Sequence, residues 1–94
     1  MMKIEKHDDG KKGYFKLLDD EKQVGKMTFT WAGPNKFIID HTEVDPGYKG
    51  EGLGRKLVKA GVDFAKENKL KIIPLCPFAK KIIEKNAEFQ EVLA

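Results

Sequence analysis

At 94 residues, the chain has enough residues to form one hydrophobic core and too few to form two, so we expect a single domain over residues 1–94. A hydrophobic content of 40% suits a small packed core, whereas no apolar run approaches the ~18 residues that a membrane-spanning helix needs. The net charge of +3 is mild, and the single cysteine excludes an internal disulfide bond.

The composition also limits the compartment and the partners. The N-terminal residues alternate charged with apolar side chains and lack the apolar centre of a signal peptide. One cysteine and two histidines are too few for an ordinary structural zinc site. The lysines are spread along the chain with acidic residues between them, which does not favour a nucleic-acid-binding surface. We therefore expect a cytoplasmic monomer that binds no metal, no nucleic acid and no membrane.

The first half of the sequence predicts four strands. Alternating or β-branched runs, separated by turn residues such as Asp-Asp-Gly and Gly-Pro-Asn, occur at residues 2–7, 14–18, 24–31 and 37–44. In the third run, Met27, Phe29 and Trp31 share one side, as in a half-buried strand. Because the connections are short, we expect an antiparallel meander.

The second half of the sequence changes to a helical period. Apolar residues such as Leu53, Leu57 and Val62 gather on one side of a predicted helix over residues 51–68. A short apolar strand over residues 70–75 follows, and its crossover connection predicts that it runs parallel to the fourth strand.

A second helix is predicted over residues 77–85, with Pro77 at its first position. We expect Phe78, Ile82 and Ile83 to pack this helix down, and part of the tail with Phe89, Val92 and Leu93 to dock. The predicted fold class is therefore α/β (α+β), with a mixed sheet of about five strands, an antiparallel meander plus one parallel strand, and two main helices.

A glycine-rich loop over residues 45–54 joins the fourth strand to the long helix. Its four glycines, Gly47, Gly50, Gly52 and Gly54, allow backbone amides to approach a ligand closely. The start of the helix adds free N–H groups and a positive dipole end, which favour a phosphate. The loop lacks the Gly-Lys-Ser/Thr ending of a P-loop, and four antiparallel strands before it do not suit a dinucleotide fold. A plain turn that starts a helix is the other interpretation.

The segment Lys49-Gly50-Glu51-Gly52-Leu53-Gly54 resembles the Arg/Gln-x-x-Gly-x-Gly/Ala signature of the GNAT N-acetyltransferases, with Lys49 in place of Arg or Gln. Together with His41-Thr42-Glu43-Val44 and Leu75-Cys76-Pro77-Phe78-Ala79, it resembles the minimal single-domain branch of that family. The resemblance implies a GNAT-like fold, acetyl-CoA or coenzyme A as cofactor, and N-acetyltransferase activity. It implies a coenzyme site formed by Val44, Lys49, Gly50, Glu51, Gly52, Leu53, Gly54, Arg55, Cys76 and Phe78.

Three side chains are candidates for chemistry. Cys76 is predicted to cap the second helix, where the positive dipole end favours a thiolate, although a lone cysteine is more often a small buried hydrophobe. His41 can act as a general base for an amine, or for Cys76 if the two converge. Strand alternation places His41 on the same side as Phe37, Ile39 and Glu43, and Glu43 is a second candidate base.

The tyrosine that often protonates the departing thiolate in the larger family is absent from its usual place, since Phe78, Ile82 and Ile83 occupy that helix. The chain also lacks the helices that normally follow the first strand and shape the amine pocket. We therefore expect an open acceptor site, suited to a protein or another bulky amine of unknown identity. A non-catalytic acyl-CoA-binding or sensing module is the alternative.

Overall fold

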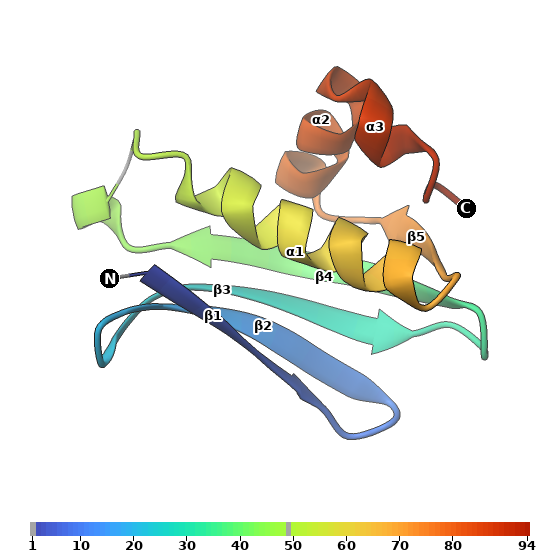
Figure 1. The fold of residues 1–94 in the computed structure, drawn as a ribbon, viewed down its shortest axis with the longest axis horizontal. Coiled ribbons are helices and arrows are strands. Elements are labelled where there is room, and N and C mark those ends of the chain that lie inside the picture. The colour runs from blue at the N-terminus through green and yellow to red at the C-terminus, as the bar shows by residue number, and fades with distance from the viewer. Residues whose placement is uncertain (1, 49) are drawn as a thin grey trace.

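The computed structural model describes residues 2–48 and 50–94, and its centre is a five-stranded mixed sheet (Figure 1). The strands follow one another in chain order across the sheet, and only the last pair is parallel. The mixed sheet predicted from the sequence is therefore confirmed. Its strands are β1 (Met2–Asp8), β2 (Lys12–Asp19), β3 (Lys22–Trp31), β4 (Lys36–Val44) and β5 (Lys71–Pro74).

Four helical segments complete the described chain: η1 (Pro46–Tyr48), α1 (Leu53–Glu67), α2 (Pro77–Lys85) and α3 (Ala87–Gln90). The predicted bounds of α2 are confirmed, with Pro77 in its first turn. The helix α1 begins later than predicted because Glu51 and Gly52 belong to the loop. Across residues 2–48 and 50–94, none of these helices has the length and apolar character that crossing a bilayer requires.

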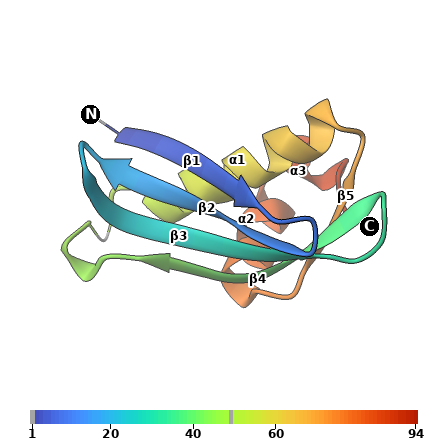
Figure 2. The ribbon, with the colours of Figure 1, turned by 90° about the horizontal axis from the view of Figure 1, so that it is seen from below.

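The core lies between α1 and one face of the sheet. The apolar stripe of α1, including Leu57, Val58 and Val62, is fully buried, as are Phe29 and Ile39 on the strands. This packing follows from the helical period of α1 and the two-residue period of the strands. Figure 2 views the opposite face of the sheet, where the strands lie in front of the helices. No helix of the described chain covers that face.

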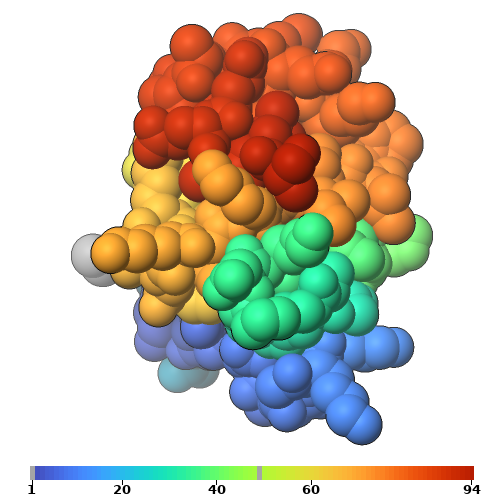
Figure 3. All heavy atoms as spheres, turned by 90° about the vertical axis from the view of Figure 1, so that its right-hand side faces the viewer, coloured from blue at the N-terminus to red at the C-terminus, as the bar shows by residue number. Residues whose placement is uncertain are grey.

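The C-terminal residues pair with the outer edge of β5. Leu93 forms a parallel bridge with Ile72, the Ile72 N–H donates to the Val92 carbonyl at 2.6 Å, and the Ala94 N–H donates to the Ile72 carbonyl at 3.0 Å. In Figure 3 this end of the chain, in red, lies against the orange segment that precedes it. The predicted docking of the tail is confirmed, with Phe89 and Val92 buried.

A β-bulge in β4 changes which side chains face the core. Thr28 of β3 pairs with His41 and the next residue, Phe29, pairs with Ile39, so Asp40 is an extra residue without a partner on β3. Before the bulge, Ile39 is fully buried; after it, His41 and Glu43 are exposed. The prediction that His41 shares a side with Ile39 is therefore wrong, because the extra residue shifts the alternation. His41 and Glu43 do share a face.

Candidate functional site

The glycine loop turns at two residues with left-handed backbone angles. Gly50 has φ of 88° and Gly52 has φ of 71°, conformations that side chains rarely allow. Gly52 is the N-cap of α1, and no side chain caps the helix there. The first N–H groups of α1 are consequently available to an anion. Lys49, the first residue of the predicted signature, lies outside the described residues.

A cavity of about 400 Å³ opens at the start of α1. It brings together the predicted coenzyme-contacting residues that the structure describes, except Glu51 and Cys76. The sequence analysis missed two of its lining residues, Tyr48 and Ile82. The spacing of Ile82, four residues after Phe78 on the same helix, is a signal that could have found it. The lining consists of Val44, Tyr48, Gly50, Gly52, Leu53, Gly54, Arg55, Phe78 and Ile82.

Phe78 forms one wall of this cavity and lies against Gly54. A Cβ atom added at Gly54 would come within 2.6 Å of Cε2 of the Phe78 ring, so only glycine permits this approach. The ring is 44% exposed. The prediction that Phe78 packs α2 into the core is therefore wrong; Ala79 and Ile83 do so. Because the ring crosses the start of α1, it joins the two helices at the cavity.

Two polar contacts hold the rest of the cavity wall. The Tyr48 hydroxyl donates a hydrogen bond to Asp19 Oδ2 at 2.8 Å, and this bond raises the pKa of Tyr48. Arg55 donates from Nη2 to Asn86 Oδ1 at 2.9 Å, and its guanidinium lies 5.5 Å from the centre of the Phe89 ring. The loop is thereby tied to the end of β2, and α1 to the segment after α2.

The strands β4 and β5 separate next to this cavity. They pair only from Lys36 to Ile39 on β4, and the Ile39 carbonyl then accepts hydrogen bonds from both Leu75 N–H, at 3.2 Å, and Cys76 N–H, at 3.1 Å. Beyond this fork, the rest of β4 pairs with β3 alone. Its free edge runs from the fork toward Val44, which lines the cavity.

Cys76 lies at the fork and caps α2. Its side chain is 6% exposed, and the thiol donates a weak hydrogen bond to Thr42 Oγ1 at 3.6 Å. Thr42 follows His41 on β4 and therefore points to the other side of the strand. The structure thus does not bring His41 and Cys76 together. Strand alternation through an unrecognised bulge concealed the role of Thr42 as the neighbour of Cys76.

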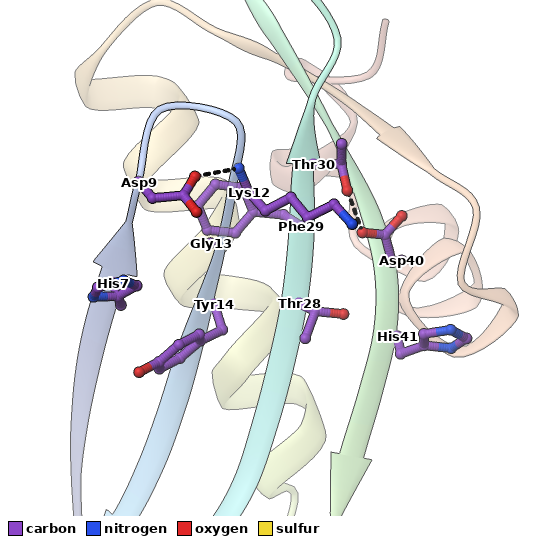
Figure 4. A pocket seen from close by; sticks show the side chains of 10 residues that line it. All are labelled: His7, Asp9, Lys12, Gly13, Tyr14, Thr28, Phe29, Thr30, Asp40 and His41. Carbon is purple, nitrogen blue, oxygen red and sulfur yellow. Dashed lines mark hydrogen bonds between the residues drawn. The ribbon is translucent and has the colours of Figure 1, made fainter.

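His41 instead belongs to an open hollow of about 660 Å³ on the helix-free face (Figure 4). His7, Tyr14, Thr28 and His41 form one row across the four antiparallel strands, and the first two rings stack at 5.2 Å. The Thr30 hydroxyl donates to Asp40 Oδ2 at 2.7 Å. Of this hollow, the sequence analysis identified only His41. No group of three His, Cys, Asp or Glu side chains within the described ranges is arranged to hold a metal ion.

The chain matches known acetyltransferases in sequence and in structure. The sequence model of the family described as GCN5-related N-acetyl-transferase matches residues 14–92. The solution structure of a GCN5-like protein from Staphylococcus aureus is 38% identical, with a TM-score of 0.70, and the match covers 96% of this chain and 87% of that one. Human Protein NATD1 is 28% identical over 80 residues, which cover 85% of this chain and 71% of that protein.

A more distant neighbour shares the fold. The crystal structure of a GNAT family acetyltransferase from Elizabethkingia anophelis, with acetyl-CoA bound, has a TM-score of 0.68 at 13% identity, and the match covers 78% of this chain and 63% of that one. The family match, the five-stranded sheet that splits between β4 and β5, and the glycine loop at the split agree with one another. The chain belongs to the GCN5-related N-acetyltransferase family.

Proposed function

We propose that this protein is an acetyl-CoA-dependent N-acetyltransferase. The observation that carries the proposal is the cavity at the start of α1, where the loop glycines, an uncapped helix N-terminus and Phe78 meet beside the split sheet. The relative from Elizabethkingia anophelis contains acetyl-CoA in the same fold, which supports this donor. Family membership supports acetyl transfer.

The residues present fit a pyrophosphate group. Gly50 and Gly52 have no heavy atom within 4 Å of the place where a Cβ would stand, so their backbone is open to a ligand. The N–H groups of Leu53, Gly54 and Arg55 belong to the first turn of α1, whose dipole favours an anion. The apolar rings and chains of the cavity suit the less polar part of the coenzyme.

The free edge of β4 is the place where we expect the thioester. Backbone N–H groups along the edge beyond the fork can donate to the carbonyl oxygen, which gains negative charge during acetyl transfer. When bound, acetyl-CoA supplies an activated acetyl group: the amine nitrogen bonds to the acetyl carbon, the carbon–sulfur bond breaks, and sulfur leaves as a thiolate. His41 accepts the proton from the amine, and Glu43 on the same face is the second candidate base.

The buried position of Cys76 supports direct attack by the amine. Its thiol is bonded to Thr42 and lies across β4 from His41, so no base identified from the sequence is placed to activate it. We therefore assign Cys76 to the wall of the acetyl site. Intact mass measurement after incubation with acetyl-CoA alone tests this assignment. An added acetyl group on the wild type that is absent from Cys76→Ala would instead establish a covalent route.

The coenzyme site is tested by titrating ¹⁵N-labelled protein with acetyl-CoA. We expect the amide signals of Gly50 to Arg55 to shift at saturable, micromolar donor concentrations, while those of β1 stay unchanged. A titration that leaves the signals of Gly50 to Arg55 in place would rule out this site. Release of free thiol in the presence of an amine then measures transfer.

A non-catalytic acyl-CoA-binding module is the second candidate. The cavity lining favours it in one respect, since the hydroxyl of Tyr48 already donates to Asp19 and α2 presents Phe78 and Ile82 instead of a proton donor. This candidate predicts the same amide shifts with no thiol release above the rate of His41→Gln. The two functions are therefore separated by turnover and not by binding.

A further inference from the structure

Charged side chains on the helix-free face are sorted by strand. Buried neighbours such as Phe15 and Met27 point to the core, so the alternate residues of β2 and β3 point outward. The outward residues between the two ends of this face are Lys12, Tyr14 and Lys16 on β2, and Lys26, Thr28 and Thr30 on β3. On β4, beyond the bulge, the outward side includes His41 and Glu43, with Asp40 beside the Thr30 hydroxyl. A basic centre thus borders an acidic margin.

The basic centre is costly for the isolated protein. Lys16 and Lys26 lie directly opposite each other on neighbouring antiparallel strands, an arrangement of like charges that destabilises a sheet. Lys16 has a partner in Glu5, 3.7 Å away, and Lys26 lies over the Tyr14 ring at 4.6 Å. Lys12 extends across the hollow in Figure 4. An anionic ligand on this face would relieve the repulsion.

The one further carboxylate at this hollow is already engaged. Asp9 Oδ1 accepts hydrogen bonds from the backbone N–H groups of Lys11, at 2.9 Å, and Lys12, at 2.8 Å. These bonds, the one from Lys12 first, lower the pKa of Asp9. Its charge therefore stabilises the turn between β1 and β2, and the lysines of β2 and β3 remain the dominant charges of the centre.

The hollow connects this face to the proposed acetyl site. Asp40 and His41 line it, and they directly follow Ile39, whose carbonyl marks the fork between β4 and β5. A ligand lying over β2 and β3 would therefore reach the edge of β4 with a short side chain. The opening is broad, so a small amine would bury little of its surface, whereas a longer chain can contact several strands.

We propose that this face binds an acidic segment of a polypeptide chain and presents a lysine of that segment to His41. The lysines of β2 and β3 complement the acidic residues of the ligand, and Asp40 and Glu43 complement its ammonium group. A nucleic acid fits less well, because its phosphates would meet the two carboxylates of β4. This inference names the acceptor class and rests on the proposed acetyltransferase function.

Three end-blocked peptides with one central lysine test the proposal. Their flanking residues are glutamate, serine or arginine, so that only the central side chain carries an acetylatable amine. We expect the glutamate-flanked peptide to shift the amides of Tyr14, Lys16, Lys26 and Thr28, and to bind about tenfold more tightly than the arginine-flanked one. With acetyl-CoA present, kcat/KM should follow the same order.

The outcomes separate this proposal from the acetyltransferase assignment. Equal or tighter binding of the arginine-flanked peptide, or shifts confined to other surfaces, overturns the acidic acceptor while leaving acetyl-CoA binding intact. Tighter binding of a single-stranded oligonucleotide than of the glutamate-flanked peptide also overturns it. Because peptide binding is measured without coenzyme, a failure of acetyl-CoA to bind does not affect this readout.

Charge reversal supplies the matched variants. Lys26→Glu should remove the preference for the glutamate-flanked peptide, by about tenfold in affinity, without changing the amide shifts that acetyl-CoA causes. Lys69→Glu, an equal change in net charge on the turn after α1, should keep the preference. If both variants lower peptide affinity equally, the effect is one of overall charge and the assigned face is wrong.

Discussion

The ring of Phe78 on α2 lies across the backbone of Gly54 on α1, and this contact forms one wall of the coenzyme cavity. A side chain at position 54 must displace the ring. We expect Gly54→Ala to raise the dissociation constant of acetyl-CoA about tenfold, equivalent to about 1.4 kcal/mol, as measured by calorimetry. The double variant Gly54→Ala/Phe78→Ala removes the overlap and should regain part of that affinity.

Gly61→Ala is the control for this change. It adds the same methyl group to the same helix, where it would lie 2.8 Å from Cε of Met27 in the core and away from the cavity. It should alter the free energy of unfolding while leaving acetyl-CoA affinity within about twofold, since distant sites act independently. An equal loss of affinity in both variants would mean that helix stability, and not the Phe78 contact, controls binding.

Tyr48 and Asp19 should respond together to pH. The hydrogen bond to Asp19 raises the pKa of Tyr48, so the bond contributes stability that is complete below the pKa of an unfolded tyrosine, about 10, and is lost as the pH rises through the folded value. In Asp19→Asn the negative charge is absent, and the pKa of Tyr48 should fall. Ultraviolet titration of the phenolate in a Tyr14→Phe background measures this. An unchanged midpoint would contradict the assigned contact.

Removal of the imidazole of His41 should slow turnover more than it weakens donor binding. As the proposed general base, His41 contributes about 10²- to 10⁴-fold to kcat, a range typical of such groups. We expect His41→Gln to lower kcat within that range with the KM for acetyl-CoA nearly unchanged. Glu43→Gln is the companion variant on the same face; if it lowers kcat more than His41→Gln does, Glu43 is the base.

Gly13 determines how closely β1 and Phe29 approach β2. A Cβ atom there would overlap both the His7 carbonyl oxygen and the Phe29 ring, and one of these is backbone that cannot turn aside. We expect Gly13→Ala to lower the free energy of unfolding by about 1–3 kcal/mol in urea titrations. At Gly47, by contrast, the nearest atom is 3.4 Å away, an ordinary contact, so Gly47→Ala should unfold like the wild type.

Most of the fold was predictable because local periodicity determines it. The helical stripe of α1 and the alternation in β2 and β3 correspond to the faces that the structure buries. The bulge at Asp40 was not predictable, because a single extra residue leaves no signal in a run where polar and apolar residues mix. Every side-chain direction after that point, including that of His41, was consequently reversed relative to the first half of β4.

The two halves of the candidate site differ in the same way. The coenzyme side lies on one continuous loop and one helix start, so its glycines could be named from the sequence. Tyr48 is recognisable only through its bond to Asp19, which is 29 residues away. The row from His7 to His41 depends on the register of four strands, and register is a property of the folded sheet.

The pairing of the C-terminal residues with Ile72 decides where a second sheet could attach. The outer edge of β5 is occupied by the chain's own end, and the free stretch of β4 is the part assigned to the acetyl donor. Within the described residues this leaves β1 as the open edge, and its alternating charges, including Lys3 and Glu5, discourage growth there. Any assembly that extends the sheet must therefore begin at β1, and acetyl-CoA should not compete with it.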